Sequence, residues 1–262
     1  VGGSTVHNIN LCYRAPEWIL EDWRRSSGIE DMTVAGMERH YQAVESRTRI
    51  TRIDESQINP NNKVAVSGSQ KLGWLIEVAR HNRTDCLGSG FCELGCAYDR
   101  KNNIPVAFLP SFVAHGGKVV THCRAQRIEM EAGSVAGVEA ISAGGRAIRI
   151  RCKRVIVSAG GIDSPALLIR SGLRHENPRI GSGLHLHPGT SVAGLFDEPI
   201  EGWRGIPQSV VVTEFFKPRP EGAYVVVSAF GHPMLFSGIV PGVGRFHREA
   251  MPQYRHVAAL SP

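Results

Sequence analysis

Apolar residues recur at helical spacing over the first third of the chain. From Pro16 they fall three to four positions apart, which predicts two amphipathic helices with these apolar positions: Trp18, Ile19 and Trp23, then Met37, Tyr41 and Val44. Asp31 or Thr33 can cap the second helix. After the break at Asn59-Pro60, similar spacing over 71–82 predicts a third helix, whose apolar side holds Leu72, Leu75, Ile76 and Ala79.

The pattern changes to short β-prone runs after residue 117. Glycine turns separate the runs 118–123, 125–130, 135–141 and 147–151, so a small antiparallel meander is predicted. Beyond residue 190, two longer β-branched and aromatic runs, 209–216 and 224–230, flank a Pro/Gly turn at 217–222. These runs predict a second, mainly antiparallel unit.

Residues 154–172 combine a strand, a turn and a helix. Val155 to Val157 form a short apolar strand, Ala159-Gly160 a small-residue turn, and a capped helix is expected from Ser164 to a stop at Gly172. This is the unit from which nucleotide-binding α/β layers are built, and the free N–H groups of the helix suit an anionic group. From the residues alone, a plain strand-to-helix connection is equally compatible.

The composition is that of an ordinary globular protein. The chain has 262 residues, 42% apolar and 21% charged, with a net charge of +6. Its basic residues are spread out, and short groups such as Arg24-Arg25 lack interleaved aromatics, so no nucleic-acid partner is expected. No apolar run approaches the roughly 20 residues of a transmembrane helix.

The opening residues form a glycine-led loop with candidate binding chemistry. Gly2-Gly3-Ser4 is followed by His7-Asn8 and later by Arg14. Paired glycines and short hydroxyl side chains allow backbone N–H groups and small donors to converge on a pyrophosphate. A simple Gly-rich turn would look the same, so this motif by itself is weak.

Together these motifs resemble the glucose–methanol–choline (GMC) oxidoreductases, flavoproteins that oxidise alcohols. Residues 154–172 are similar to the family's second signature, and residues 1–14 to its flavin-proximal loop. Residues 117–125 resemble its adenine-contacting strand, with Ala125 where the family often has Val. Residues 180–188 resemble the segment after the signature. Within the family, the chain looks closest to long-chain alcohol oxidases and their bacterial relatives.

The resemblance implies FAD as the cofactor and an α/β (α+β) fold. We expect a partial FAD-binding, Rossmann-like domain with a β-meander over 1–190, carrying a helical and Cys-rich insertion at about 16–110. The start of an antiparallel substrate-binding domain is expected over 191–262. The residues expected to contact FAD are Gly2, Gly3, Ser4, His7, Asn8, Ala125, Ala159 and Gly160.

The implied reaction is oxidation of an alcohol to an aldehyde or ketone by hydride transfer to flavin, with oxygen or a redox partner as electron acceptor. Two parts of the family pattern are not found: the G-x-G-x-x-G fingerprint and a late catalytic His. We therefore expect an internal piece of the enzyme and assign no catalytic residue. The alternatives are an FAD-linked dehydrogenase that reduces a cytochrome or quinone, and a non-catalytic relic.

His7 allows two hypotheses. In some family members a His in this place is bonded covalently to the flavin, and an imidazole is a suitable nucleophile because its neutral form is abundant near neutral pH. The alternative, which we favour, is a His that only hydrogen-bonds near the cofactor.

Cys86, Cys92 and Cys96 form a C-x5-C-x3-C cluster in a glycine-rich loop. With a fourth ligand such as His81 or Cys123 they could hold zinc or an iron–sulfur cluster. The spacing is not the usual paired C-x2-C, so a packed loop, with or without a disulfide, is favoured and no metal is predicted. His185 and His187 are expected to have structural or flavin-side roles.

Overall fold

The computed structural model describes residues 1–218, 220, 222–228, 230–240 and 242–262. By its internal contacts the chain divides into two compact units. Unit 1 comprises residues 1–111 and 189–262, and unit 2 comprises residues 112–188. Helix α6 (Leu109–Ala114) crosses the boundary between them. The division expected at residue 190 stays a prediction.

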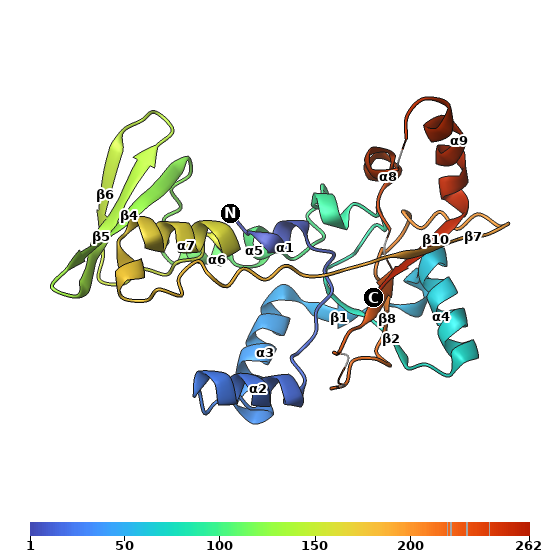
Figure 1. The fold of residues 1–262 in the computed structure, drawn as a ribbon, viewed down its shortest axis with the longest axis horizontal. Helices are drawn as coiled ribbons and strands as arrows, with labels where there is room; N and C mark the ends of the chain where they lie inside the picture. Colours follow the sequence, from blue (N-terminus) through green and yellow to red (C-terminus); the bar gives the residue numbers. More distant parts are fainter. Residues whose placement is uncertain (219, 221, 229, 241) are drawn as a thin grey trace. The chain divides into compact units, whose positions relative to one another are not determined.

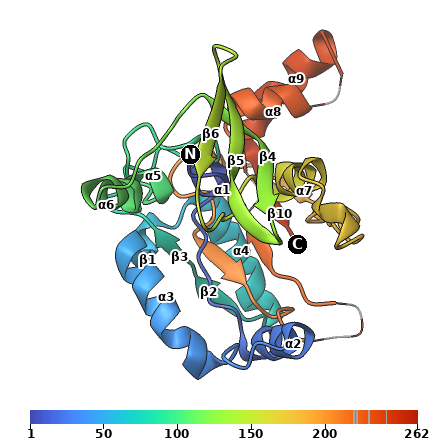
Figure 2. The same cartoon turned by 90° about the vertical axis from the view of Figure 1, so that its left-hand side faces the viewer.

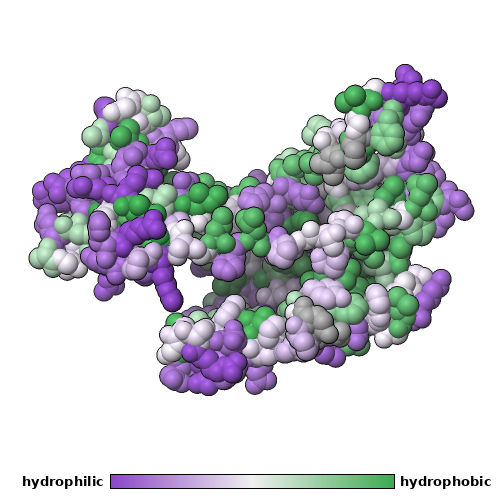
Figure 3. All heavy atoms as spheres, viewed as in Figure 1, coloured by the Kyte–Doolittle hydropathy of each residue, from purple (hydrophilic) through white to green (hydrophobic). Residues whose placement is uncertain are grey.

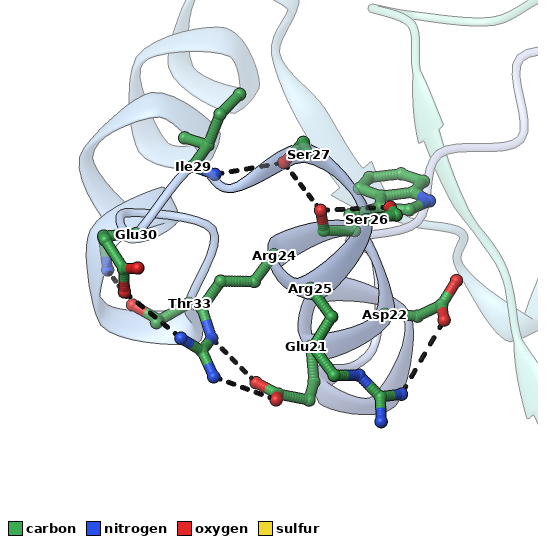
Figure 4. A network of polar contacts seen from close by, with 11 residues as sticks. Glu21, Asp22, Arg24, Arg25, Ser26, Ser27, Ile29, Glu30 and Thr33 are labelled. Atoms are coloured by element: carbon green, nitrogen blue, oxygen red, sulfur yellow. Dashed lines mark hydrogen bonds and ion pairs between the residues drawn. The ribbon is translucent and has the colours of Figure 1, made fainter.

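Both helices expected after Pro16 are present in unit 1. They are α2 (Glu17–Ser27) and α3 (Val34–Thr48). Gly28, with a φ of 70°, ends α2, and the Thr33 hydroxyl caps α3 by accepting a hydrogen bond from Gly36 N at 3.0 Å. Ion pairs from Arg24 to Glu21 and Glu30 close the turn between the helices (Figure 4). Because these pairs face solvent, each contributes little to stability.

The helix predicted over 71–82 is wrong. Helix α4 (Pro60–Leu72) lies earlier: Asn59 caps its start, and Gly73, with a φ of 69°, ends it. Residues 76–82 instead form the strands β2 (Ile76–Val78) and β3 (Arg80–Asn82). Ile76 and Val78 pair with the β-branched residues of β8 (Val210–Val212), and this tertiary pairing overrides the helical spacing.

A five-stranded antiparallel sheet forms the main layer of unit 1 (Figure 1). Its order is β2-β8-β9-β10-β7, where β7 is Val192–Leu195, β9 is Val226–Ser228 and β10 is Val257–Ser261. Strand β8 is buried along its length, and α4 packs on β8, β9 and β10. Antiparallel strands are therefore present after residue 190, but the expected runs 209–216 and 224–230 are strands only at β8 and β9, and β2 from earlier in the chain belongs to the same sheet. Arg219 and Glu221 of the expected turn, and Ala229 of the expected run 224–230, lie outside the described residues.

Shorter elements complete unit 1. Strand β1 (Ile50–Arg52) pairs with β3. The remaining helices of this unit are α1 (Ser4–His7), α5 (Ile104–Ala107), α8 (Pro233–Ile239) and α9 (Arg245–Gln253), with single 3₁₀ turns at Glu55–Gln57, Cys92–Leu94 and Tyr254–His256.

Three buried asparagines at the start of α4 join the helix to the sheet and its loops. The amide of Asn59 donates to Gly202 O at 3.0 Å, and Asn61 exchanges hydrogen bonds with the backbone of Ala259 in β10. Asn62 accepts from the N–H groups of Ser209 and Val210, both at 3.1 Å, and donates to Pro207 O at 2.9 Å. Buried backbone groups of the segment before β8 are thereby paired.

Unit 2 is a three-stranded antiparallel meander with one helix (Figure 2). The strands are β4 (Cys123–Glu131), β5 (Ser134–Ser142) and β6 (Ala147–Arg151). Helix α7 (Gly160–Arg170) packs on β4, and a 3₁₀ turn at Leu173–His175 follows it. The Ser171 hydroxyl accepts a hydrogen bond from Ile128 N at 2.8 Å, which fixes the end of α7 against β4.

Two expected strands of unit 2 are not formed. The run 118–123 becomes a strand only at Cys123, because His122 has a φ of 52°, outside the β region. The segment Val155 to Val157 is no strand either, and Ile156 is 91% exposed. A parallel strand needs neighbours to pair its backbone, and no described residue pairs with this segment. The mixed α+β class with antiparallel sheets is nevertheless the one expected.

The surface is polar over the two-helix turn of unit 1, where the α2 region is largely purple in Figure 3. Across the described residues, no helix combines the length and the apolar character needed to cross a membrane.

We predict that Asn62→Ala destabilises the full-length protein by about 3 kcal/mol, because buried N–H and C=O groups next to β8 lose their partners. Asn62→Asp keeps the acceptor oxygen but replaces the donor amide with an oxygen that faces Asn59 Oδ1 and Pro207 O and buries a charge, so it should lose at least as much. Denaturant unfolding measures both changes. Gln70→Ala, at an exposed position of the same helix, is the control and should stay within about 0.5 kcal/mol of wild type.

Candidate functional site

The amino-terminal loop, residues 1–10, holds five of the predicted cofactor residues. Gly2 has a φ of 94°, and a Cβ there would lie 2.6 Å from Cδ of Pro105, so only glycine fits. Gly3, with a φ of 50°, precedes the single turn α1. Ser4, His7 and Asn8 are exposed, so the loop presents polar side chains outward.

The back of this loop is held by residues 101–105. Lys101 is only 1% exposed, and its ammonium donates to Val6 O at 2.8 Å, to Asn8 O, and to Cys92 O at 3.0 Å. The Thr5 hydroxyl accepts from Ile104 N at 3.2 Å. Sequence reasoning missed Lys101 because it stands in an irregular polar segment, where neither spacing nor a family motif indicates burial.

Arg14, the later arginine of the loop motif, has a structural role. Its guanidinium makes a two-pronged ion pair with Glu45, with both N–O distances at 2.8 Å, and reaches Glu38 at 2.8 Å. The Glu45 carboxylate therefore has a lowered pKa, caused first by its hydrogen bond from Arg14. These bonds tie the end of the loop segment to α3.

The three clustered cysteines line one small cavity, which we call the thiol pocket: Cys86, Cys92 and Cys96 together with Arg83, Arg100 and Lys101. Its volume of about 20 Å³ has room for roughly one water molecule. Burial, followed by the neighbouring Cys86, raises the pKa of Cys92 to about 11, so this thiol is protonated near neutral pH. The three cysteines are free thiols in this structure.

The metal alternative finds no support, because no three His, Cys, Asp or Glu side chains of the described residues converge as ligands. The proposed fourth ligand His81 lies in β3 and is 0% exposed. Burial, followed by the positive charge of Arg83, lowers its pKa to about 3. His81 is thus a neutral core residue.

The other predicted cofactor residues belong to unit 2. Ala125 lies in β4 opposite Ala140. Ala159 and Gly160 are exposed at the start of α7, where Gly160 has a φ of 89° and open space around its Cα. The Ser164 hydroxyl accepts from Ala159 N at 2.9 Å. His185 and His187 are also exposed, and His185 contacts Gly183 O.

These arrangements suit a dinucleotide. Gly160 and Gly161 leave the amino end of α7 open, so its N–H groups can reach an anionic group without interference from a Cβ. The amino-terminal loop adds exposed hydroxyl, imidazole and amide groups on a fixed backbone. Taken each by itself, these two features of an α+β protein are the ones expected of a nucleotide-binding protein.

The chain belongs to the GMC oxidoreductase family, whose model matches residues 1–189. It is 32% identical to a GMC-type oxidoreductase of Mycobacterium tuberculosis over 93% of this chain and 38% of that protein. With one from Sinorhizobium fredii the identity is 32%, over 87% of this chain and 45% of the relative. The chain therefore spans less than half the length of these relatives.

Two further comparisons concern activity and fold. A long-chain-alcohol oxidase of Arabidopsis thaliana is 28% identical over 76% of this chain and 28% of its own length. The crystal structure of pyridoxine 4-oxidase matches 96% of this chain and 53% of its own chain, with a TM-score of 0.59 and 15% identity. These comparisons confirm the family and fold expected from the sequence, and FAD is the cofactor that family membership assigns.

We predict that the neutral state of His81 makes the protein acid-sensitive. Because its folded pKa of about 3 lies below the ordinary value near 6.5, the unfolded chain binds the proton first, and stability falls as the pH drops below about 6.5. Between pH 7.5 and pH 5 the loss from this residue is about 2 kcal/mol. Denaturant unfolding at both pH values should show that His81→Gln lacks this part of the loss. Equal pH dependence in both proteins would contradict the assignment.

Proposed function

We propose that the chain is part of an FAD-dependent enzyme that oxidises an alcohol to an aldehyde or ketone. The observation that carries the proposal is the amino-terminal loop, whose exposed Ser4, His7 and Asn8 stand on a backbone held from behind by Lys101. When bound, FAD supplies the hydride acceptor.

In this proposal, Gly2 and Gly3 contact the cofactor through their backbone, while Ser4 and Asn8 offer it hydrogen bonds. Gly3 has open space where a Cβ would lie, so the cofactor can approach it closely, whereas the same side of Gly2 is filled by Pro105. His7 lies beside the flavin and can donate or accept one hydrogen bond in its neutral form. A loop fixed before binding loses little conformational entropy when the cofactor arrives.

In unit 2, Ala159 and Gly160 provide the open helix start that faces the phosphates, and Ala125 offers its strand backbone to the adenine. Ser164 contributes indirectly, because its hydroxyl accepts from Ala159 N and holds the turn in shape. No residue of this chain is assigned to remove the hydroxyl proton. The names of the relatives support long-chain alcohols as the first substrates to test and oxygen as the electron acceptor.

His7 provides one test. We expect a hydrogen-bonding His7, so acid precipitation of the purified full-length protein should leave all the yellow flavin in the supernatant. His7→Ala should weaken FAD binding by about tenfold or less, the loss of one hydrogen bond, as titration of apoprotein with FAD would measure. Flavin that stays with the precipitate of wild type but not of His7→Ala would establish a covalent bond instead.

The reaction provides a second test. The full-length protein should consume oxygen when given a long-chain primary alcohol, as an oxygen electrode would show. Reduction of an artificial dye with no oxygen uptake would favour the FAD-linked dehydrogenase. A flavin-loaded protein that turns over neither acceptor with any alcohol would overturn the proposal and leave a non-catalytic relative of the family.

A further inference from the structure

Lys101 is a buried cation whose donors all serve backbone groups. Its Nζ donates to Val6 O at 2.8 Å, to Cys92 O at 3.0 Å and to Asn8 O, which uses the three donors of an ammonium group. With 1% of its surface exposed, the side chain has given up nearly all contact with water. Burying a lysine is costly, so the three carbonyls are what makes this position tolerable.

The charge of Lys101 is not compensated by a carboxylate. No ion pair recorded among the described residues includes it, and the other charged groups that line its pocket are Arg83 and Arg100. Burial accordingly lowers the pKa of Lys101, although the thiols of Cys92 and Cys96 act in the opposite direction. A residue retained for an ion pair would have an acidic partner, so the geometry indicates that Lys101 is there for its directed donors.

The groups that Lys101 holds flank His7. Val6 O belongs to the peptide group that precedes His7, and Asn8 O belongs to the peptide group one residue beyond it. Holding these two carbonyls therefore fixes the backbone on either side of the His7–Asn8 pair. The next residues reinforce this attachment, since Ile104 N donates to Thr5 and Pro105 packs against Gly2. Residues 101–105 thus support the amino-terminal loop through hydrogen bonds and packing. The His7 and Asn8 side chains of this loop are exposed to solvent.

The third hydrogen bond of Lys101 holds a second loop, which contains Cys92. Cys92 begins the 3₁₀ turn that packs against α1, and its carbonyl shares the Lys101 ammonium with the amino-terminal loop. Two loops about 85 residues apart in sequence are therefore held by one side chain. Neither loop has a regular sheet or a long helix that would hold it otherwise.

We propose that Lys101 is a positioning residue for the flavin cofactor. By holding the carbonyls of Val6 and Asn8, it sets the direction of His7 and Asn8 before FAD arrives, and its loss lowers the affinity for FAD by releasing the loop. This inference rests on the proposed function of the amino-terminal loop.

The test compares Lys101→Met, Lys101→Arg and the exposed control Lys71→Met in the full-length protein. Methionine keeps the length of the side chain without its donors, whereas arginine restores charge and donors. Titration of apoprotein should give an FAD Kd about tenfold higher for Lys101→Met, a value within about threefold of wild type for Lys101→Arg, and no change for Lys71→Met. Amide hydrogen exchange of residues 4–8 in the apoprotein should accelerate in Lys101→Met alone.

Two results would overturn the inference. One is an unchanged FAD Kd and unchanged exchange in Lys101→Met. The other is an equal loss in the Met and Arg variants, accompanied by the same fall in apoprotein Tm, which would mean a role in stability only. Wild-type protein that binds no FAD would instead overturn the proposed function, and hydrogen exchange would still decide whether Lys101 fixes the loop.

Discussion

Unit 1 depends on one constraint: buried backbone groups in its irregular segments must find hydrogen-bond partners within the protein. Much of this unit is loop, and its strands are only three to five residues long. Buried polar side chains meet the constraint. Asn59, Asn61 and Asn62 serve the segments around the sheet, while Lys101 serves the amino-terminal loop. Where a larger sheet would pair backbone with backbone, this unit pairs backbone with side chains.

At the candidate site, the same constraint gives the buried polar groups a structural role and leaves the exposed ones for binding. Two titratable groups behind the amino-terminal loop are buried and serve the fold. Lys101 donates hydrogen bonds to backbone carbonyls, and His81 is a neutral core residue. The side chains of Ser4, His7 and Asn8 are exposed. Asn8 Oδ1 already accepts a hydrogen bond from Asn10 N at 3.2 Å, so this residue would meet a cofactor with its amide N–H groups. A binding loop is preorganised when its backbone is already fixed and its polar side chains are exposed. The conformational entropy of ordering the loop is then lost on folding and not on cofactor binding.

Unit 2 shows how a family motif and its local structure can differ. The helix expected in 154–172 is present, ends near Gly172 and packs on β4. Its start is not the expected one, because α7 begins at Gly160 rather than Ser164 and its N-cap residue Ala159 makes no side-chain cap. The strand before it is absent, because no described segment offers its backbone a partner. A helix satisfies its hydrogen bonds internally, so it forms from local sequence, whereas a strand depends on residues elsewhere.

The sequence by itself determined the family, the cofactor, the helices after Pro16, the β-meander and the glycine-led loop, because these rest on local spacing, capping residues and contiguous motifs. Only the tertiary structure decided that 76–82 are strands, because Val210 to Val212 pair with residues more than 130 positions away. It also decided that His81 is a neutral core residue, that Arg14 binds α3, and that Lys101 holds the loop from behind. Burial and long-range hydrogen bonds set these roles, and neither can be predicted from the spacing of apolar and polar residues along the sequence.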